Sequence, residues 1–220
     1  MALDTAQRRR ICDFLSFKGE ETFVKHAVIF AHPKPESFTG SVASAYAKAA
    51  SALGHEVTIR DLYRMNFQPC LQCDELPFTE GFRPRPDVVE ERAVLRDVDV
   101  FVLCYPLWLD APPAMMKGYL ERVFGFGFAY GRDGHSEPLL SGRKLITFSS
   151  SGAPIHWVEQ TGALGAIKTL FDRYFAEACG LTALDHVHFG GIVPGIRPDA
   201  VETRLVEVQD TVKKHFGRRA

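Results

Sequence analysis

The feature that most constrains the fold is an apolar stretch, 98–106, that ends at a proline and is followed by a loop and a proline pair. Its β-branched residues are typical of a parallel strand buried on both faces. Residues 114–124 then have helical spacing, so we expect a strand, a loop and a helix in succession. Ligands of open α/β sheets bind where such strands end. The loop 106–109, which contains Trp108, is therefore predicted to pack against a flat aromatic cofactor.

The remainder of the chain alternates between apolar runs and helical patterns. Further strands are predicted at 25–31, 55–62, 144–148 and 184–192, and further helices after residue 41 and at 88–96, 156–179 and 199–216. The run 55–62 alternates apolar and polar residues, which places it nearer the edge of the sheet. This βαβα order predicts an α/β fold, a doubly wound parallel sheet with right-handed crossovers and helices on both faces.

We expect a single domain at 26–220 and an N-terminal extension at 1–25. Residues 63–87 contain four prolines and several phenylalanines without a clear period, and they are predicted to form a packed functional loop. Residues 125–134 alternate glycines with aromatic rings. These rings could wall a pocket or could plug the core.

Composition narrows the classes of partner. The 26 Lys and Arg residues against 27 Asp and Glu residues leave a formal net charge of −1. This balance gives no basic field for nucleic acid and no acidic field of the kind that small electron carriers often show. No apolar run reaches the roughly 18 to 20 residues that span a bilayer. We therefore expect a cytoplasmic protein without nucleic-acid binding or membrane insertion.

The five cysteines are an odd number, which argues against a disulfide framework. Cys70 and Cys73 have C-x-x-C spacing, so a redox or zinc role must be weighed against two ordinary loop cysteines. The chain has no second cysteine pair, and this pair does not lie between a strand and a helix start. We therefore interpret Cys70 and Cys73 as two ordinary loop cysteines, and no metal site is predicted.

The loop 32–41 joins a predicted strand to a predicted helix and is rich in hydroxyl groups. A helix N-terminus offers free N–H groups and a partial positive charge, so Ser37, Thr39 and Ser41 are candidates for binding a phosphate. The alternative is that Ser37 or Thr39 is only an N-cap. Neither G-x-x-x-x-G-K nor G-x-G-x-x-G occurs here, which argues against triphosphate and Rossmann dinucleotide sites. The small polar strand end 149–154 is predicted to form the second side of the crevice.

Three motifs of the sequence resemble those of a known protein family. They are Ala31-His32-Pro33 with Ser37-Phe38-Thr39, the stretch from Tyr105-Pro106-Leu107-Trp108 to Lys117-Gly118-Tyr119-Leu120-Glu121-Arg122-Val123-Phe124, and Gly127-Phe128-Ala129-Tyr130. The chain resembles the flavodoxin-like NAD(P)H dehydrogenase (quinone) family, which includes modulators of drug activity and potassium-efflux ancillary proteins. The resemblance implies a five-stranded sheet of order 2-1-3-4-5 and a homodimer. It also implies a flavin, FAD or in some members FMN, that NAD(P)H reduces and a quinone reoxidises by a ping-pong mechanism.

The resemblance also implies the site residues. The residues carried over as flavin contacts are His32, Ser37, Phe38, Thr39, Ser41, Pro106, Leu107, Trp108, Leu109, Ser149, Ser150, Ser151, Gly152 and Trp157. The implied substrate pocket is walled by Trp108, Phe128 and Tyr130, from the same or the partner subunit. The chemistry is assigned to the flavin, and the protein is expected to bind and orient it.

The chain departs from the family at two positions. Members of the family have a Tyr and a His after the loop that corresponds to 149–152 here, and these residues are proposed to stabilise charge on the flavin. In this chain, Trp157 and Ala163 occupy those positions. The Trp157 N–H can donate a hydrogen bond but cannot relay a proton. The neighbouring His156 either substitutes for the missing group or is a surface residue. Two other functions stay open, namely a regulatory subunit of a membrane transporter and a one-electron flavodoxin-type carrier.

Overall fold

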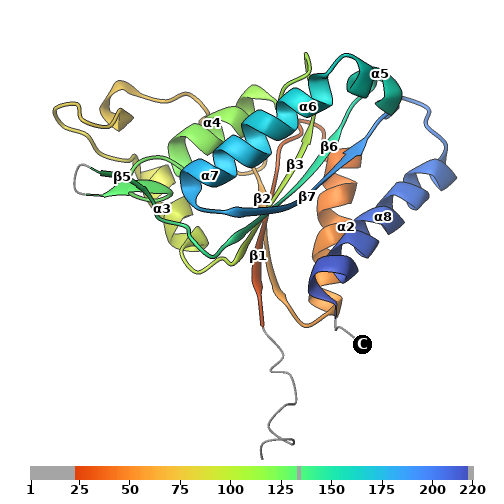
Figure 1. The fold of residues 1–220 in the computed structure, drawn as a ribbon, viewed down its shortest axis with the longest axis horizontal. Coiled ribbons are helices and arrows are strands. Elements are labelled where there is room, and N and C mark those ends of the chain that lie inside the picture. The colour runs from red at the N-terminus through yellow and green to blue at the C-terminus, as the bar shows by residue number, and fades with distance from the viewer. Residues whose placement is uncertain (1–22, 133–134, 218–220) are drawn as a thin grey trace, which may run out of the picture.

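The computed structural model describes residues 23–132 and 135–217. Its core is a five-stranded parallel sheet of order β2-β1-β3-β6-β7, flanked by helices on both faces (Figure 1). The strands are β1 (Lys25–Phe30), β2 (Glu56–Asp61), β3 (Val100–Pro106), β6 (Lys144–Ser150) and β7 (Thr182–Phe189). Counted within this sheet, the order is 2-1-3-4-5. The predicted doubly wound flavodoxin-like fold and the edge position of the second strand are confirmed.

Helices α2 (Phe38–Ala52) and α8 (Pro198–Phe216) cover one face of the sheet. The other face is covered by α3 (Pro86–Leu95), α4 (Ala114–Val123) and a segmented helix described below. All seven residues of β3 are buried, and they alternate between the two cores. Val102 and Cys104 pack toward α2 and α8, while Leu103 and Tyr105 pack toward α4. The continuous apolar run therefore reflects a central strand that is covered on both sides.

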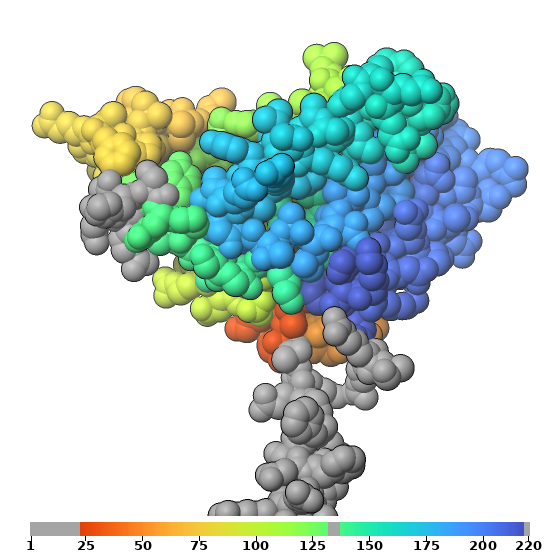
Figure 2. All heavy atoms as spheres, viewed as in Figure 1, coloured from red at the N-terminus to blue at the C-terminus, as the bar shows by residue number. Residues whose placement is uncertain are grey.

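The excursion 63–87 is tied to the domain by α4. It contains a short 3₁₀ turn, η1 (Cys73–Glu75), and it projects at the orange-to-yellow end of the molecule in Figure 2. Gly118 of α4 lies against the backbone of Pro69, because a Cβ at Gly118 would be 2.0 Å from the Pro69 carbonyl oxygen. Leu62 and Phe67 are buried in the same core. The predicted packed excursion is thus observed.

The single helix predicted at 156–179 is wrong. The chain forms α5 (Ile155–Gln160), α6 (Ala163–Ile167), a π-helix η2 (Lys168–Tyr174) and α7 (Phe175–Cys179). Gly162 separates the first two segments with a φ of 76°, a left-handed conformation that glycine adopts readily. Helical spacing predicted the apolar stripe but could not reveal this interruption.

The loop predicted at 125–134 is also wrong in part. Within it, β4 (Tyr130–Arg132) pairs antiparallel with β5 (His135–Pro138), and residues 133–134 lie outside the described residues. Both interpretations of its rings apply, to different residues. Phe128 packs against the core beside Phe124, whereas Phe126 and Tyr130 line a pocket.

Element ends differ from the predictions by a few residues. The last strand begins earlier, at Thr182, and ends at Phe189, because the chain leaves the sheet at Gly190. A Cβ at Gly190 would lie 2.3 Å from the Ile155 amide nitrogen, so this close passage needs glycine. The predicted extension 1–25 lies outside the described residues up to residue 22. Within 23–132 and 135–217, no helix combines the length and apolar composition that a membrane crossing requires.

Candidate functional site

The three predicted loops emerge together at the carboxyl edge of the sheet. The Ala31 N–H donates to the Cys104 carbonyl (3.2 Å), and the Leu107 N–H donates to the Ser150 carbonyl (2.6 Å). Ser151 N–H in turn donates to the Phe189 carbonyl on β7 (3.0 Å). The ends of β1, β3, β6 and β7 are thus joined by backbone hydrogen bonds. The crevice expected at this edge of an open α/β sheet is built from the predicted segments.

The loop after β1 presents the N-terminus of α2. Ser37 is the N-cap, since its Oγ accepts the Gly40 N–H at 3.1 Å and its carbonyl accepts the Ser41 N–H at 2.9 Å. The first N–H groups of a helix have no intrahelical acceptor, so the amides of Phe38 and Thr39 point outward for an anion. The capping role of Ser37 is therefore observed, and it leaves a donor set that suits a phosphate.

A basic side chain holds this loop in place. Arg64 Nη2 donates to the Pro33 carbonyl at 2.6 Å and to the His32 carbonyl at 3.3 Å. The Lys34 N–H donates to His32 Nδ1 at 3.1 Å, which closes a tight turn. Burial lowers the pKa of His32 from its ordinary value, and the charges of Lys34 and Arg64 act in the same direction. His32 is thereby favoured as a neutral ring at the mouth of the site.

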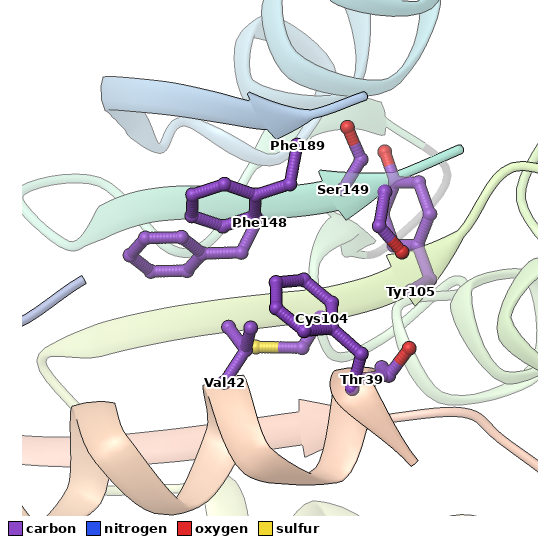
Figure 3. A pocket seen from close by; sticks show the side chains of 9 residues that line it. Thr39, Val42, Cys104, Tyr105, Phe148, Ser149 and Phe189 are labelled. Atoms are coloured by element: carbon purple, nitrogen blue, oxygen red, sulfur yellow. The ribbon is translucent and has the colours of Figure 1, made fainter. Parts of the chain in front are cut away.

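A small recess of about 10 Å³ lies between α2 and the ends of β3, β6 and β7 (Figure 3). It is lined by Phe38, Thr39, Val42, Cys104, Tyr105, Phe148, Ser149, Ser150 and Phe189. The Tyr105 hydroxyl is buried without a hydrogen-bond partner among the described residues. Burial, with the nearby Asp172 and Cys104, raises the pKa of Tyr105 well above its ordinary value. A volume of this size admits one water-sized polar atom and is too small for a flat ring.

The loop after β3 forms a tight turn that carries Trp108 into solvent. Trp108 and Ala111 exchange backbone hydrogen bonds of 2.9 and 3.2 Å, and Leu109 and Asp110 between them have φ angles of 52° and 55°. Trp108 is 45% exposed and its ring is edge-on to His32, with the centroids 6.0 Å apart. This turn is the pale green projection at the top of Figure 2. His32 and Trp108, both predicted as cofactor contacts, therefore meet.

The serines at the end of β6 do not all face the crevice. Ser149 is buried, and its Oγ lies within hydrogen-bond distance of two ring nitrogens, His186 Nε2 and His188 Nδ1. Ser151 Oγ contacts His188 Nε2 at 3.0 Å and the Ala153 carbonyl at 2.8 Å. Ser150 lines the recess, and Gly152 is exposed beyond it. The two histidines were missed from the sequence, although their i, i+2 spacing in a predicted strand indicates a shared face.

Trp157 and His156, the candidates for the role of the family's Tyr and His, lie on α5, the short helix after this loop. Trp157 is 46% exposed and His156 is exposed. The backbone N–H of Trp157 donates to the Pro154 carbonyl at 3.0 Å. Neither side chain has a hydrogen-bond partner among the described residues. Both are free to contact a ligand at this edge of the sheet, and their roles stay predictions.

The predicted substrate walls are not assembled in one subunit. Tyr130 lines a pocket of about 290 Å³ beside the excursion, together with Phe126 and Arg122. Phe128 lies instead under the guanidinium of Arg92, 5.7 Å from its ring centroid. Neither ring lines the recess beside the Trp108 turn. Within the described residues, the three predicted walls therefore do not line one pocket.

Cys70 and Cys73 are both exposed in the excursion. In the part of the chain that the structure describes, no group of three or more His, Cys, Asp or Glu side chains is placed to hold a metal ion.

Comparison with known proteins agrees with this architecture. A family described as having a flavodoxin-like fold matches residues 24–216. An uncharacterised NAD(P)H oxidoreductase of Haemophilus influenzae is 32% identical over 171 residues, which cover 77% of this chain and 85% of that protein. The human ribosyldihydronicotinamide dehydrogenase [quinone] is 28% identical over 187 residues, 76% of this chain and 77% of that protein.

A solved structure extends the match to three dimensions. The NAD(P)H:quinone oxidoreductase of Methanothermobacter marburgensis superimposes with a TM-score of 0.77 at 25% identity, over 90% of this chain and 100% of that one. The family match at residues 24–216 includes the five strands of the sheet and the three loops of the crevice. The chain therefore belongs to the flavodoxin-like family that includes the NAD(P)H quinone oxidoreductases.

Proposed function

We propose that this protein is a flavin-dependent NAD(P)H oxidoreductase that reduces a quinone or a similar two-electron acceptor. The observation that carries the proposal is the meeting of three segments at one sheet edge: the N-terminus of α2, the Trp108 turn and the Ser150–Ser151 strand end. The names of the relatives support the same reaction. The reaction balances as NAD(P)H, one proton and a quinone giving NAD(P)⁺ and a hydroquinone.

The residues present fit a flavin. The free amides at the start of α2 suit its phosphate. The exposed Trp108 offers an apolar face beside the ring system. We propose FAD as the flavin, with FMN as the alternative, and a bound flavin would supply the hydride chemistry. The protein's own contribution is to bind the phosphate, orient the ring and exclude water.

We further propose that the functional unit is a homodimer. Several large apolar side chains are exposed on one subunit, among them Leu109 at 102% and Phe78 at 77%. Phe128 and Tyr130 lie away from the recess of their own subunit, so a partner subunit is the source from which they could complete the acceptor pocket. One pocket shared by NAD(P)H and acceptor leads to ping-pong kinetics.

The test begins with the colour of the purified protein. We expect a yellow protein whose flavin is released on denaturation and identified by mass. Anaerobic NADH or NADPH should bleach it, and a benzoquinone should restore the colour. A colourless protein that takes up neither FAD nor FMN would end the proposal. Light scattering then measures the dimer, and a flavin-loaded monomer with full activity would reject the two-subunit site.

A further inference from the structure

A chain of hydrogen bonds runs from the loop after β6 to the π-helix, and the proposed flavin contacts do not account for it. Ser151 Oγ is 3.0 Å from His188 Nε2, and His188 Nδ1 is 2.8 Å from Ser149 Oγ. Ser149 Oγ is 2.7 Å from His186 Nε2, and His186 Nδ1 is 2.5 Å from Asp172 Oδ2. These five residues form one unbranched path from the crevice into the protein.

The fold explains why they meet. Ser149 is opposite His188 in the parallel pairing of β6 with β7, and Thr147 is opposite His186. Residues two apart on a strand share a face, so both histidines point toward η2. The π-helix supplies Asp172, whose second oxygen accepts the Thr147 hydroxyl at 2.8 Å. At one end of the path Ser151 follows Ser150, which lines the recess, and at the other end Asp172 and His186 line a separate pocket of about 340 Å³ beside η2 and β7.

The order Asp172, His186, Ser149 resembles the triad of serine hydrolases, but the geometry excludes that function. Ser149 is 1% exposed, and its hydroxyl is shared between His186 and His188. The recess that it lines has a volume of about 10 Å³, too small for an ester or amide substrate. A path of alternating hydroxyl groups and ring nitrogens can, however, carry a proton.

Counting protons gives the path two complete arrangements. In the first, every donor points toward Asp172: Ser151 O–H to His188 Nε2, His188 Nδ1–H to Ser149, Ser149 O–H to His186 Nε2, and His186 Nδ1–H to Asp172. Both rings are neutral. The contact between Ser151 and the Ala153 carbonyl then has no proton, although that carbonyl still accepts the Gly191 N–H at 2.9 Å.

In the second arrangement the donors reverse. His186 carries protons on both nitrogens and donates to Asp172 and Ser149, Ser149 donates to His188 Nδ1, and His188 Nε2–H donates to Ser151. Ser151 is then free to donate to the Ala153 carbonyl at 2.8 Å, so each contact has its proton. The two arrangements differ by one proton. When Ser151 Oγ accepts a proton, each proton along the path shifts to the next hydrogen-bonded atom. The result is a cationic His186 beside Asp172.

We propose that Ser151, His188, Ser149, His186 and Asp172 are a store for one proton that opens at Ser151 onto the crevice. Because it supplies a proton to the reaction proposed above, its role rests on that proposed function. A hydride brings two electrons and one hydrogen to a quinone, and the hydroquinone needs one further proton. The store delivers that proton at Ser151 Oγ while the acceptor covers the crevice, and it refills from solvent by the same route when the crevice is open.

The geometry assigns the stored charge to His186, whose Nδ1 lies 2.5 Å from Asp172 Oδ2. Burial, together with the charges of His186 and Lys168, lowers the pKa of His188 to about 4, so His188 passes the proton and does not hold it. Asp172 lies against the other ring, where it stabilises the cation. The titratable and charged groups that face this pair are Lys168, Arg173 and Glu177 from η2 and α7, Tyr105 from β3, and Asp185, which is paired with Lys214 and His215.

The decisive test needs no flavin. With ¹⁵N-labelled histidine rings in the full chain, nitrogen shifts report which nitrogen of each ring carries a proton. On acidification, we expect His188 to move its proton from Nδ1 to Nε2 in the same step in which a second proton appears on the His186 ring. His186→Gln and His188→Gln assign the signals. A His188 that keeps one tautomer while His186 charges, or rings that both stay unchanged, would overturn the proposal.

Matched variants separate a proton store from a merely structural network. Ser149→Ala cuts the path between the rings, so His188 should no longer follow His186, and Ser149→Thr, which keeps the hydroxyl, should restore the coupling. Thr147→Val removes a buried hydroxyl that bonds to Asp172 outside the path, so the coupling should persist. Coupling that survives Ser149→Ala would refute the store. If that variant does not fold, Ser151→Ala at the loop end should hold His188 in its Nδ1–H form.

A second readout connects the store to turnover. In weak buffer with an indicator dye, a single turnover with benzoquinone should reoxidise the flavin before the protein takes up a proton from solvent. In Ser149→Ala, flavin reoxidation and proton uptake from solvent should occur at the same time. A protein that binds no flavin would reject the proposed function, yet the nitrogen shifts would still decide whether the store exists.

Discussion

Arg122 and Glu75 form a buried ion pair in which Arg122 Nε lies 2.9 Å from Glu75 Oε2 and Nη2 lies 2.8 Å from Oε1. The two side chains are 2% and 4% exposed, and Arg122 also binds Asp87. Glu75→Gln should therefore lower the free energy of unfolding by about 3 kcal/mol, because it leaves a buried guanidinium without its main partner. Urea unfolding measures the change.

The control for that variant is an exposed pair. Asp210→Asn removes a contact to Lys213, in which both side chains are more than 60% exposed. Its effect should stay within about 1 kcal/mol. Equal losses in the two variants would contradict the structural role assigned to Glu75.

Two substitutions of Ser37 separate helix capping from phosphate binding. Ser37→Ala removes the acceptor of the Gly40 N–H and should cost about 1 kcal/mol of stability. Ser37→Asp keeps a cap acceptor but adds a negative charge beside the helix N-terminus, so stability should be retained while flavin affinity falls at least about tenfold. Thermal unfolding and flavin titration check the two effects. Unchanged affinity in Ser37→Asp would argue against a phosphate at this helix.

Tryptophan fluorescence can locate the flavin, because the chain contains only Trp108 and Trp157. In Trp157→Phe, added flavin should quench the emission of Trp108, and Trp108→Ala should weaken flavin binding by up to about tenfold. Since Trp108 is half exposed, its loss should hardly change the melting temperature. Full flavin affinity in Trp108→Ala would exclude the predicted contact.

The turn after Trp108 is strained by its sequence. Leu109 has a φ of 52°, which suits Asn or Gly, and its side chain is fully exposed. Leu109→Asn should therefore stabilise an isolated subunit by about 1 kcal/mol. If Leu109 contacts a partner subunit, the same variant should weaken the dimer. Unfolding and dilution experiments on one preparation separate the two effects.

The stability of the protein should fall in mild acid because of a buried histidine. Burial, followed by the charges of His55 and Lys144, lowers the pKa of His26 to about 3. The unfolded chain protonates this ring near pH 6.5, so it binds the proton that the folded chain refuses. Stability is complete above that pH and should decline by about 1.4 kcal/mol per pH unit as the pH falls toward 3.

His26→Gln tests this dependence, since glutamine can still hydrogen-bond the Tyr46 hydroxyl that His26 Nδ1 contacts at 2.9 Å. Between pH 6 and pH 4, the free energy of unfolding of the variant should lack the pH dependence that His26 contributes. An identical slope in both proteins would assign the acid sensitivity to other groups.

The strands and their order could be predicted from sequence because burial on both faces leaves a continuous apolar run, as in β3. The segmentation of the helix after Pro154 could not, since Gly162 interrupts the backbone without interrupting the apolar stripe. The crevice loops were recognised by motif. Asp172 and His186 were missed because they come together only through the pairing of β6 with β7 and the π-helix.

Gly118 has a consequence for engineering. Since a Cβ at Gly118 would lie 2.0 Å from the Pro69 carbonyl oxygen, no other amino acid fits there unless the excursion moves. The excursion and α4 therefore form a single exchangeable module. A chimera that imports a relative's excursion should accept the graft only when the matching helix comes with it.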